Sequence, residues 1–243
     1  MRKDNVFGMA GAVALAAMMA AAAPALAQQQ SPMLDDLVAA GTIPPVAERL
    51  PANPLVVDGE SVGQYGGTWR MGMNGGGDNG LIVKTVAYEG LVRYDHEWAG
   101  VLPNLAESWE VNEDATEYTF KLREGVKWSD GTPFTTEDIA FAVEMYQDPE
   151  YAAGSWIDNV NNPVALEVVD DYTFKFSFGT PNGMFMETLA SVDGIHITSL
   201  PKHYCSQFHP SYNDNADADA QAAGFDGWAL YLQDRCAWGW ETI

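Results

Sequence analysis

Basic residues are scarce in this chain. Its 243 residues include 12 Lys and Arg against 34 Asp and Glu, which gives a formal net charge of −22. Nucleic acids and anionic membrane surfaces are bound through clusters of Lys and Arg. Neither is therefore expected as a partner, and the acidic surface is expected mainly to keep the protein in solution.

Long hydrophobic runs are also missing, except near the N-terminus. Arg2 and Lys3 precede an apolar run over residues 6–23, and Ala25-Leu26-Ala27 has the small residues of a cleavage site. This order is typical of a secretory signal peptide (residues 1–27) rather than an N-terminal membrane anchor, because the Ala-rich run has no basic flank after it. We expect cleavage before Gln28, a periplasmic mature protein and no membrane insertion after cleavage.

Cysteine is limited to Cys205 and Cys236, both in the part expected to be exported. In an oxidising compartment such a pair indicates a disulfide, here closing a loop of about thirty residues. Two buried thiols are the alternative. A zinc site formed by His203, Cys205 and His209 is not expected, because a second pair of Cys or His ligands is missing.

Signals for other bound groups are weak. Gly75-Gly76-Gly77 is not followed by the Gly-Lys-Ser/Thr of a nucleotide phosphate loop. The Asp- and Ala-rich stretch over 213–224 lacks the sixth-position glycine and the final Glu of a calcium loop, so a solvated linker or a helix start is expected there. No metal and no cofactor is predicted.

The densest pattern in the chain covers residues 105–146. A short strand over 108–111 and a polar turn precede residues 118–123, where apolar and polar side chains alternate as in a strand with one buried face. Thr135 then provides an N-cap, with Asp138 three residues later as an acidic variant of the capping box. Apolar residues recur at helical spacing beyond it. The pattern predicts a β-hairpin, an ordered turn and a capped amphipathic helix.

In its residues this tract, LAESWEVNEDATEYTFKLREGVKWSDGTPFTTEDIAFAVEMY, resembles the signature of family 5 solute-binding proteins of ABC importers, the dipeptide-, oligopeptide- and nickel-binding receptors. The resemblance implies an α/β, periplasmic-binding-protein type II-like fold with two lobes and mixed β-sheets. Family members are longer, so an N-terminal (lobe I) fragment is expected. Its parts would be an extended leader over 28–62 and the first portion of the solute-binding domain over 63–243, truncated at the C-terminus.

Shorter patterns predict the remaining elements. In chain order these are a helix over 32–40, a Gly-led strand over 63–73, a helix over 81–88, a strand within 89–95, a second hairpin over 164–178 that turns at Asp170-Asp171, a helix over 184–190, a strand over 195–197 and a helix that Ser199 could cap.

The resemblance also indicates where a solute would bind. The loop after the Gly-led strand approaches the ligand in this family, so Asn74, Asp78 and Asn79 are candidate polar contacts. A flexible turn without contacts is the alternative for this loop. Tyr151 and Trp156 follow the amphipathic helix and are candidate stacking residues, with packing against the scaffold as the alternative.

The function implied is that of the periplasmic substrate-binding component of an ABC transporter. Such a protein captures a peptide-like or other small oligomeric solute and delivers it to a permease and ATPase complex, and it acts as a monomer without catalytic residues. A secreted hydrolase of polysaccharide or peptide and a non-transporting sensor are the alternatives. The carboxylates of the signature are expected to belong to the scaffold; they are Glu107, Glu110, Glu124, Glu137 and Asp138.

Overall fold

The computed structural model describes residues 30–57, 59, 61, 63–75, 78, 89–151, 157, 159 and 161–236. The predicted signal peptide and the predicted helix over 81–88 lie outside these residues. Within them, the fold is α/β and every strand pairing is antiparallel.

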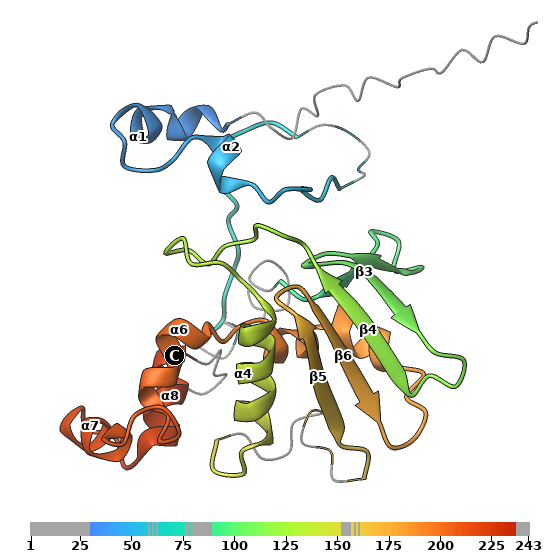
Figure 1. Ribbon diagram of the computed structural model, residues 1–243. Coiled ribbons are helices and arrows are strands. Elements are labelled where there is room, and N and C mark those ends of the chain that lie inside the picture. Colours follow the sequence, from blue (N-terminus) through green and yellow to red (C-terminus); the bar gives the residue numbers. More distant parts are fainter. Residues whose placement is uncertain are drawn as a thin grey trace, which may run out of the picture.

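A four-stranded sheet is the main sheet of the described residues (Figure 1). Its strands are β3 (Ala106–Val111), β4 (Glu117–Leu122), β5 (Val164–Asp170) and β6 (Thr173–Phe178), in the order β3-β4-β6-β5. Both predicted hairpins are confirmed, β3 with β4 and β5 with β6. Their inner strands β4 and β6 pair with each other, so the two similar sequence patterns join into one sheet.

The alternation along β4 and β6 explains the buried face of this sheet. Tyr118, Phe120 and Leu122 point to the core, and Phe174 and Phe176 do the same from β6. Phe120 pairs with Phe174 in the register, and their ring centroids are 5.4 Å apart. Burying rings of this size contributes much of the core's stabilisation.

The predicted amphipathic helix is α4 (Thr136–Gln147), and its capping box is confirmed. The Thr135 side chain accepts a hydrogen bond from the Glu137 N–H at 3.3 Å, while the Asp138 carboxylate accepts one from the Thr135 N–H at 3.0 Å. The helix buries Ile139, Ala142 and other apolar side chains in the core.

A small β-hairpin precedes the main sheet. It consists of β1 (Val92–Tyr94) and β2 (Val101–Pro103), joined by the loop over 95–100. The strand predicted within residues 89–95 is thus confirmed. Leu91 and Val92 are buried, which anchors the hairpin to the core.

Short helices follow the sheet. They are α5 (Phe185–Ala190), the 3-10 helix η4 (Val192–Ile197), α6 (Lys202–Cys205), the 3-10 helix η5 (Ser206–Phe208), α7 (Ala216–Ala222) and α8 (Trp228–Cys236). The Asp- and Ala-rich stretch therefore contains a helix, α7. A disulfide joins Cys205 in α6 to Cys236 in α8, with the Cα atoms 6.0 Å apart.

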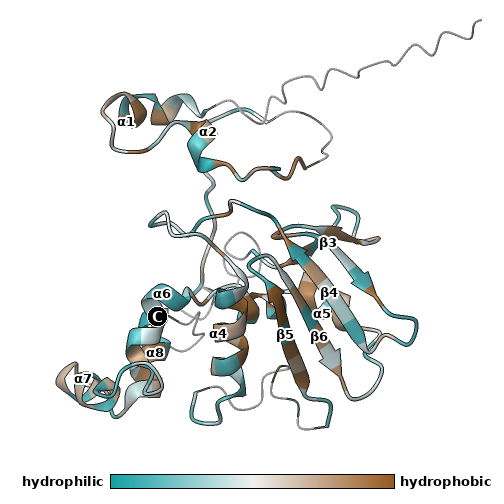
Figure 2. Ribbon diagram, viewed as in Figure 1, coloured by the Kyte–Doolittle hydropathy of each residue, from teal (hydrophilic) through white to brown (hydrophobic). Residues whose placement is uncertain are grey.

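The leader contains a 3-10 turn, η2 (Pro32–Leu34), and two short helices, α1 (Asp35–Ala39) and α2 (Val46–Arg49). The first two confirm the helix predicted over 32–40, whereas α2 was not predicted. No residue of α1 is buried, and this helix stands apart from the sheet in Figure 1, with its hydrophobic residues visible in Figure 2. The division into a leader over 28–62 and a domain over 63–243 stays a prediction.

The strand predicted over 63–73 is wrong, since these residues have no regular secondary structure. Gly66 and Gly67 have φ angles of +97° and +91°, a conformation that interrupts an extended strand. None of the strand pairings among the described residues includes this segment, and Trp69 is 66% exposed.

Two further expectations after α5 are also wrong. Residues 195–197 belong to η4, where the Ser191 hydroxyl accepts from the Asp193 N–H at 3.2 Å and the Gly194 N–H bonds to the Ser191 carbonyl. These local bonds close tight turns and leave no extended backbone. Ser199 does not cap α6, because the Asp138 carboxylate accepts the Lys202 N–H at 2.9 Å.

Among the described residues, none of the helices combines the length and the apolar character that a bilayer crossing requires.

Candidate functional site

The loop predicted to contact a solute is partly described, and it brings two of its three candidates together. The Asn74 N–H donates to the Asp78 carboxylate, and the Asp78 N–H donates to the Gly75 carbonyl at 3.1 Å. Both Asn74 and Asp78 are exposed. Asn79 lies outside the described residues. The turn is therefore closed by one backbone bond and by the Asp78 carboxylate, and both Asn74 and Asp78 lie on the surface.

For Tyr151 the structure favours packing over stacking on a solute. Its side chain is 4% exposed and meets the Tyr146 ring edge to face, with 5.5 Å between the centroids. Burial raises the pKa of Tyr151 far above its ordinary value and raises that of Tyr146 to about 12. The Tyr151 carbonyl also accepts from the Gln233 side chain. This ring is part of the core, and Trp156 lies outside the described residues.

Asp138 connects two elements of the scaffold. It is 5% exposed, and its two oxygens accept the N–H of Thr135 at 3.0 Å and the N–H of Lys202 at 2.9 Å. The carboxylate thus caps α4 and holds the start of α6 against it. The predicted scaffold role of this signature residue agrees with its position.

The sequence did not predict a set of hydrogen bonds that connects the leader to the sheet. Arg123 is buried, and its guanidinium donates to the carbonyls of Asn104, at 3.2 Å, and of Asn53. The Asn53 amide donates to Glu107 at 2.6 Å, and this bond is the main reason that the pKa of Glu107 lies below its usual range. Arg123 comes directly after Leu122 in an alternating strand, so its sequence position predicts a solvent-facing side chain.

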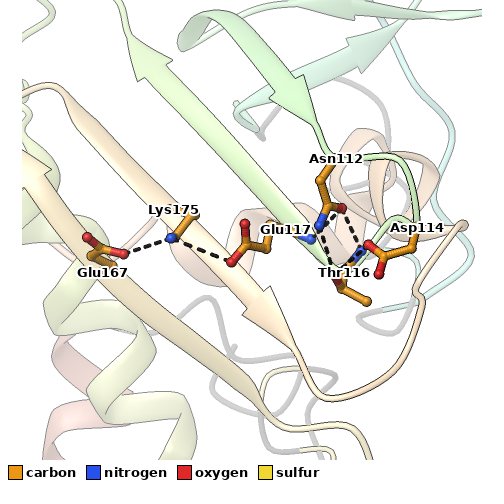
Figure 3. A network of polar contacts seen from close by, with 6 residues as sticks. All are labelled: Asn112, Asp114, Thr116, Glu117, Glu167 and Lys175. Atoms are coloured by element: carbon orange, nitrogen blue, oxygen red, sulfur yellow. Dashed lines mark hydrogen bonds and ion pairs between the residues drawn. The ribbon is translucent and has the colours of Figure 1, made fainter.

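The solvent face of the sheet carries a polar network (Figure 3). Lys175 on β6 lies 2.9 Å from the Glu167 carboxylate and 3.6 Å from that of Glu117. The hydrogen bond to Glu167 and the charge of Glu117 raise the pKa of Lys175. At the β3–β4 turn, the Asn112 side chain accepts the N–H groups of Thr116 and Glu117, both at 2.9 Å. Because these polar groups bond to one another, this surface is suited to supporting the fold.

A shallow hollow of about 380 Å³ opens at the end of the sheet where the β5–β6 turn lies. Its lining is Lys121, Glu124, Asp170, Asp171, Tyr172 and Thr173. A glycosidase-type hydrolase needs one carboxylic acid whose pKa is raised, so that it can donate a proton. The N–H of Tyr172 instead lowers the pKa of Asp170. The pKa values of the Glu107 and Asp130 carboxyls are likewise lowered, so these carboxylates favour the charged form.

The residues that could have suggested zinc are engaged separately. Cys205 is in the disulfide, and His203 Nε2 lies 2.6 Å from the Asp130 carboxylate. His209 Nδ1 accepts the Ser211 N–H at 3.1 Å. Within the described residues, no three metal-binding side chains form a group.

The family model described as bacterial extracellular solute-binding proteins, family 5 Middle, matches residues 100–227, more than half of the chain. The periplasmic alpha-galactoside-binding protein of Rhizobium meliloti (strain 1021) is 31% identical over 201 residues, covering 73% of this chain and 29% of that protein. The periplasmic oligopeptide-binding protein OppA of Salmonella typhimurium is 30% identical over 146 residues, covering 54% and 26%.

Solved structures give a similar result. A structure named oligopeptide-binding protein OppA superposes with a TM-score of 0.74 at 39% identity, covering 85% of this chain and 32% of that one. The periplasmic binding protein MelB of Agrobacterium fabrum C58, in complex with stachyose, gives a TM-score of 0.52 at 25% identity, covering 74% and 30%. The chain thus spans about a third or less of the length of these relatives.

Proposed function

This chain belongs to the bacterial extracellular solute-binding proteins of family 5, and from that premise we propose that it serves an ABC importer as its substrate-binding component. It captures a small oligomeric solute in the periplasm and delivers it to a permease and ATPase complex. The match over residues 100–227 carries this proposal, because it covers the four-stranded sheet, α4 and most of the helices that follow.

The proposed mechanism is closure of two lobes around the solute. A solute that contacts both lobes binds the closed form more tightly and so shifts the population toward it. The described part fits a rigid body in such a motion, because Asp138 and Arg123 tie its elements together through buried hydrogen bonds. The energy for transport comes from the separate ATPase.

The proposed solute contacts are Asn74, Asp78 and Asn79, with Trp156 as a stacking side chain. Asn74→Ala is the cleanest test, because the contact of Asn74 with Asp78 uses its backbone N–H, which the substitution keeps. Loss of one polar contact should weaken solute binding about 5- to 10-fold in isothermal titration calorimetry on the full-length protein. Unchanged affinity would remove Asn74 from the site.

Two solute classes are supported by the relatives. OppA is named for oligopeptides, whereas the Rhizobium meliloti relative is named for alpha-galactosides and MelB is in complex with stachyose. A thermal-shift screen of the full-length protein with tri- to pentapeptides and with stachyose separates them. A ligand present at 100 times its Kd stabilises the folded state by about 2.7 kcal/mol. Protein that neither class stabilises would contradict both assignments.

The hydrolase and the sensor remain testable alternatives. Turnover of a labelled peptide or polysaccharide, lost when Glu124 or Asp171 is replaced by alanine, would support the hydrolase. The lowered pKa of Asp170 in the same hollow argues against a proton donor at that position. For the sensor, the gene should lack neighbouring permease and ATPase genes.

A further inference from the structure

The tip of the β1–β2 hairpin presents a tryptophan to solvent. Trp98 lies in the loop over 95–100 and is 73% exposed. One side of its indole stacks on the Tyr94 ring, with 4.9 Å between the centroids and 29° between the planes. Such an indole is therefore held in place on one side while most of its surface is open to a partner.

The backbone of this tip is fixed in an unfavourable conformation. Trp98 has a φ angle of +59°, a region that bulky residues rarely adopt and glycine adopts readily. The Asp95 carboxylate accepts the N–H groups of Glu97 at 3.0 Å and of Ala99 at 2.8 Å, and the Asp95 N–H donates to the Gly100 carbonyl at 3.0 Å. The loop thus keeps a strained tryptophan where glycine would cost less, which points to a use for the indole.

The stacking partner is also held. The Tyr94 hydroxyl donates to the Glu187 carbonyl on α5 at 3.3 Å, which connects the ring to the core. A preorganised aromatic side chain of this kind loses little conformational entropy on binding. Tryptophan is also among the residues that most often dominate the energy of a protein interface.

The charges around the indole indicate which partner it suits. Glu97 has a 74% exposed side chain, and Asp95 adds a second carboxylate, on a chain of net charge −22. His96 is also exposed, 3.8 Å from Glu97. Arg93 precedes Tyr94 in β1, so its side chain faces the opposite side of the hairpin. Tryptophan is the best aromatic partner for a cation, and arginine is the cation most often found there.

We propose that Trp98, with Tyr94 behind it and Glu97 and Asp95 beside it, docks a basic segment of a partner protein, with an arginine guanidinium over the indole. A neutral saccharide could stack on the indole too, but it would make no use of the negative charge of Glu97 and Asp95 beside it. The surface does not include Asn74 or Asp78, so this inference is independent of the solute-binding proposal.

The test uses the full-length protein and a hexa-arginine peptide, with a hexa-glutamine peptide as the neutral control, in isothermal titration calorimetry. Trp98→Gly should weaken hexa-arginine binding about 2- to 5-fold. Glu97→Gln should weaken it less and reduce its dependence on salt. Trp69→Gly is the matched control, because Trp69 is also exposed, at 66% against 73% for Trp98, but neighbours Arg70 instead of carboxylates. Binding that is equal in all variants would be non-specific attraction to the acidic surface and would overturn the proposal.

A second measurement separates docking from scaffolding. If the indole has no structural role, Trp98→Gly relieves the positive φ and the melting temperature should be unchanged or higher by about 2–4 °C. Trp98→Asn, which also tolerates positive φ, should behave in the same way. A clear fall in melting temperature for both variants would make Trp98 a scaffold residue. Binding of stachyose that depends on Trp98, without binding of hexa-arginine, would overturn the proposal in favour of a saccharide.

Discussion

Replacing Asp138 by alanine tests how the signature stabilises this fold. The carboxylate accepts two backbone hydrogen bonds, from Thr135 and from Lys202, and it is almost fully buried. A hydrogen bond to a charged group contributes about 1.5–3 kcal/mol, and the substitution leaves two N–H groups without this acceptor. Asp138→Ala should therefore lower the free energy of unfolding by about 3–5 kcal/mol. For a domain of this size the melting temperature would fall by roughly 6–20 °C.

Urea unfolding of the full-length protein, followed by circular dichroism, measures this loss. Asp138→Asn keeps one oxygen acceptor and should lose about half as much. The matched control is the neighbouring Glu137→Ala, which removes only an exposed ion pair with Lys202 at 3.3 Å and should stay within about 0.5 kcal/mol of wild type. A loss below about 1 kcal/mol for Asp138→Ala, or an equal loss for both alanine variants, would refute the reasoning.

Three further predictions concern other parts of the scaffold. Replacing Cys205 and Cys236 together by alanine opens a loop of 31 residues and should lower the free energy of unfolding by about 3–4 kcal/mol; an unchanged urea midpoint would contradict this. Gly194→Ala should destabilise strongly in a thermal melt, because its Cβ would lie 2.1 Å from a carbonyl oxygen of α5, whereas Gly183→Ala meets nothing within 4 Å and should melt like wild type. The pKa of Tyr146 is raised from 10.0 to about 12, so the unfolded state loses its proton first and stability should fall as the pH rises from 10 to 12. That fall should be smaller in Tyr146→Phe, and equal falls would exclude this group as a cause.

The elements that the sequence predicted well are those whose pattern is local. Phe120 and its neighbours alternate along β4, and Thr135 with Asp138 marks the start of α4, so periodicity and capping identify both. The sequence around Gly66 and Gly67 is compatible with a strand, and it did not indicate that both glycines adopt positive φ angles. Residues 195–197 are apolar enough for a strand, but bonds from the preceding residues close a 3-10 helix there.

The candidate site was harder to predict, because its residues depend on distant parts of the chain. Tyr151 is buried by Tyr146 from α4 and is contacted by Gln233 from α8, which lies 82 residues later. Arg123 continues an alternating strand in sequence, yet it reaches the leader at Asn53. For the turn at Asn74 and Asp78, the glycines around it predicted the loop but not which side chains a solute would contact.

The way the signature residues are used explains why they indicate a family and not a solute. The two carboxylate oxygens of Asp138 accept hydrogen bonds at the starts of α4 and α6, and Arg123 donates to backbone carbonyls. The rings of Phe120 and Tyr118 are in the core. These side chains are directed at the protein itself, which agrees with the similarity of this chain both to a receptor named for oligopeptides and to one named for alpha-galactosides. On the proposed function, discrimination between solutes is then expected from residues outside the signature, and exposed Asn74 and Asp78 are the described candidates.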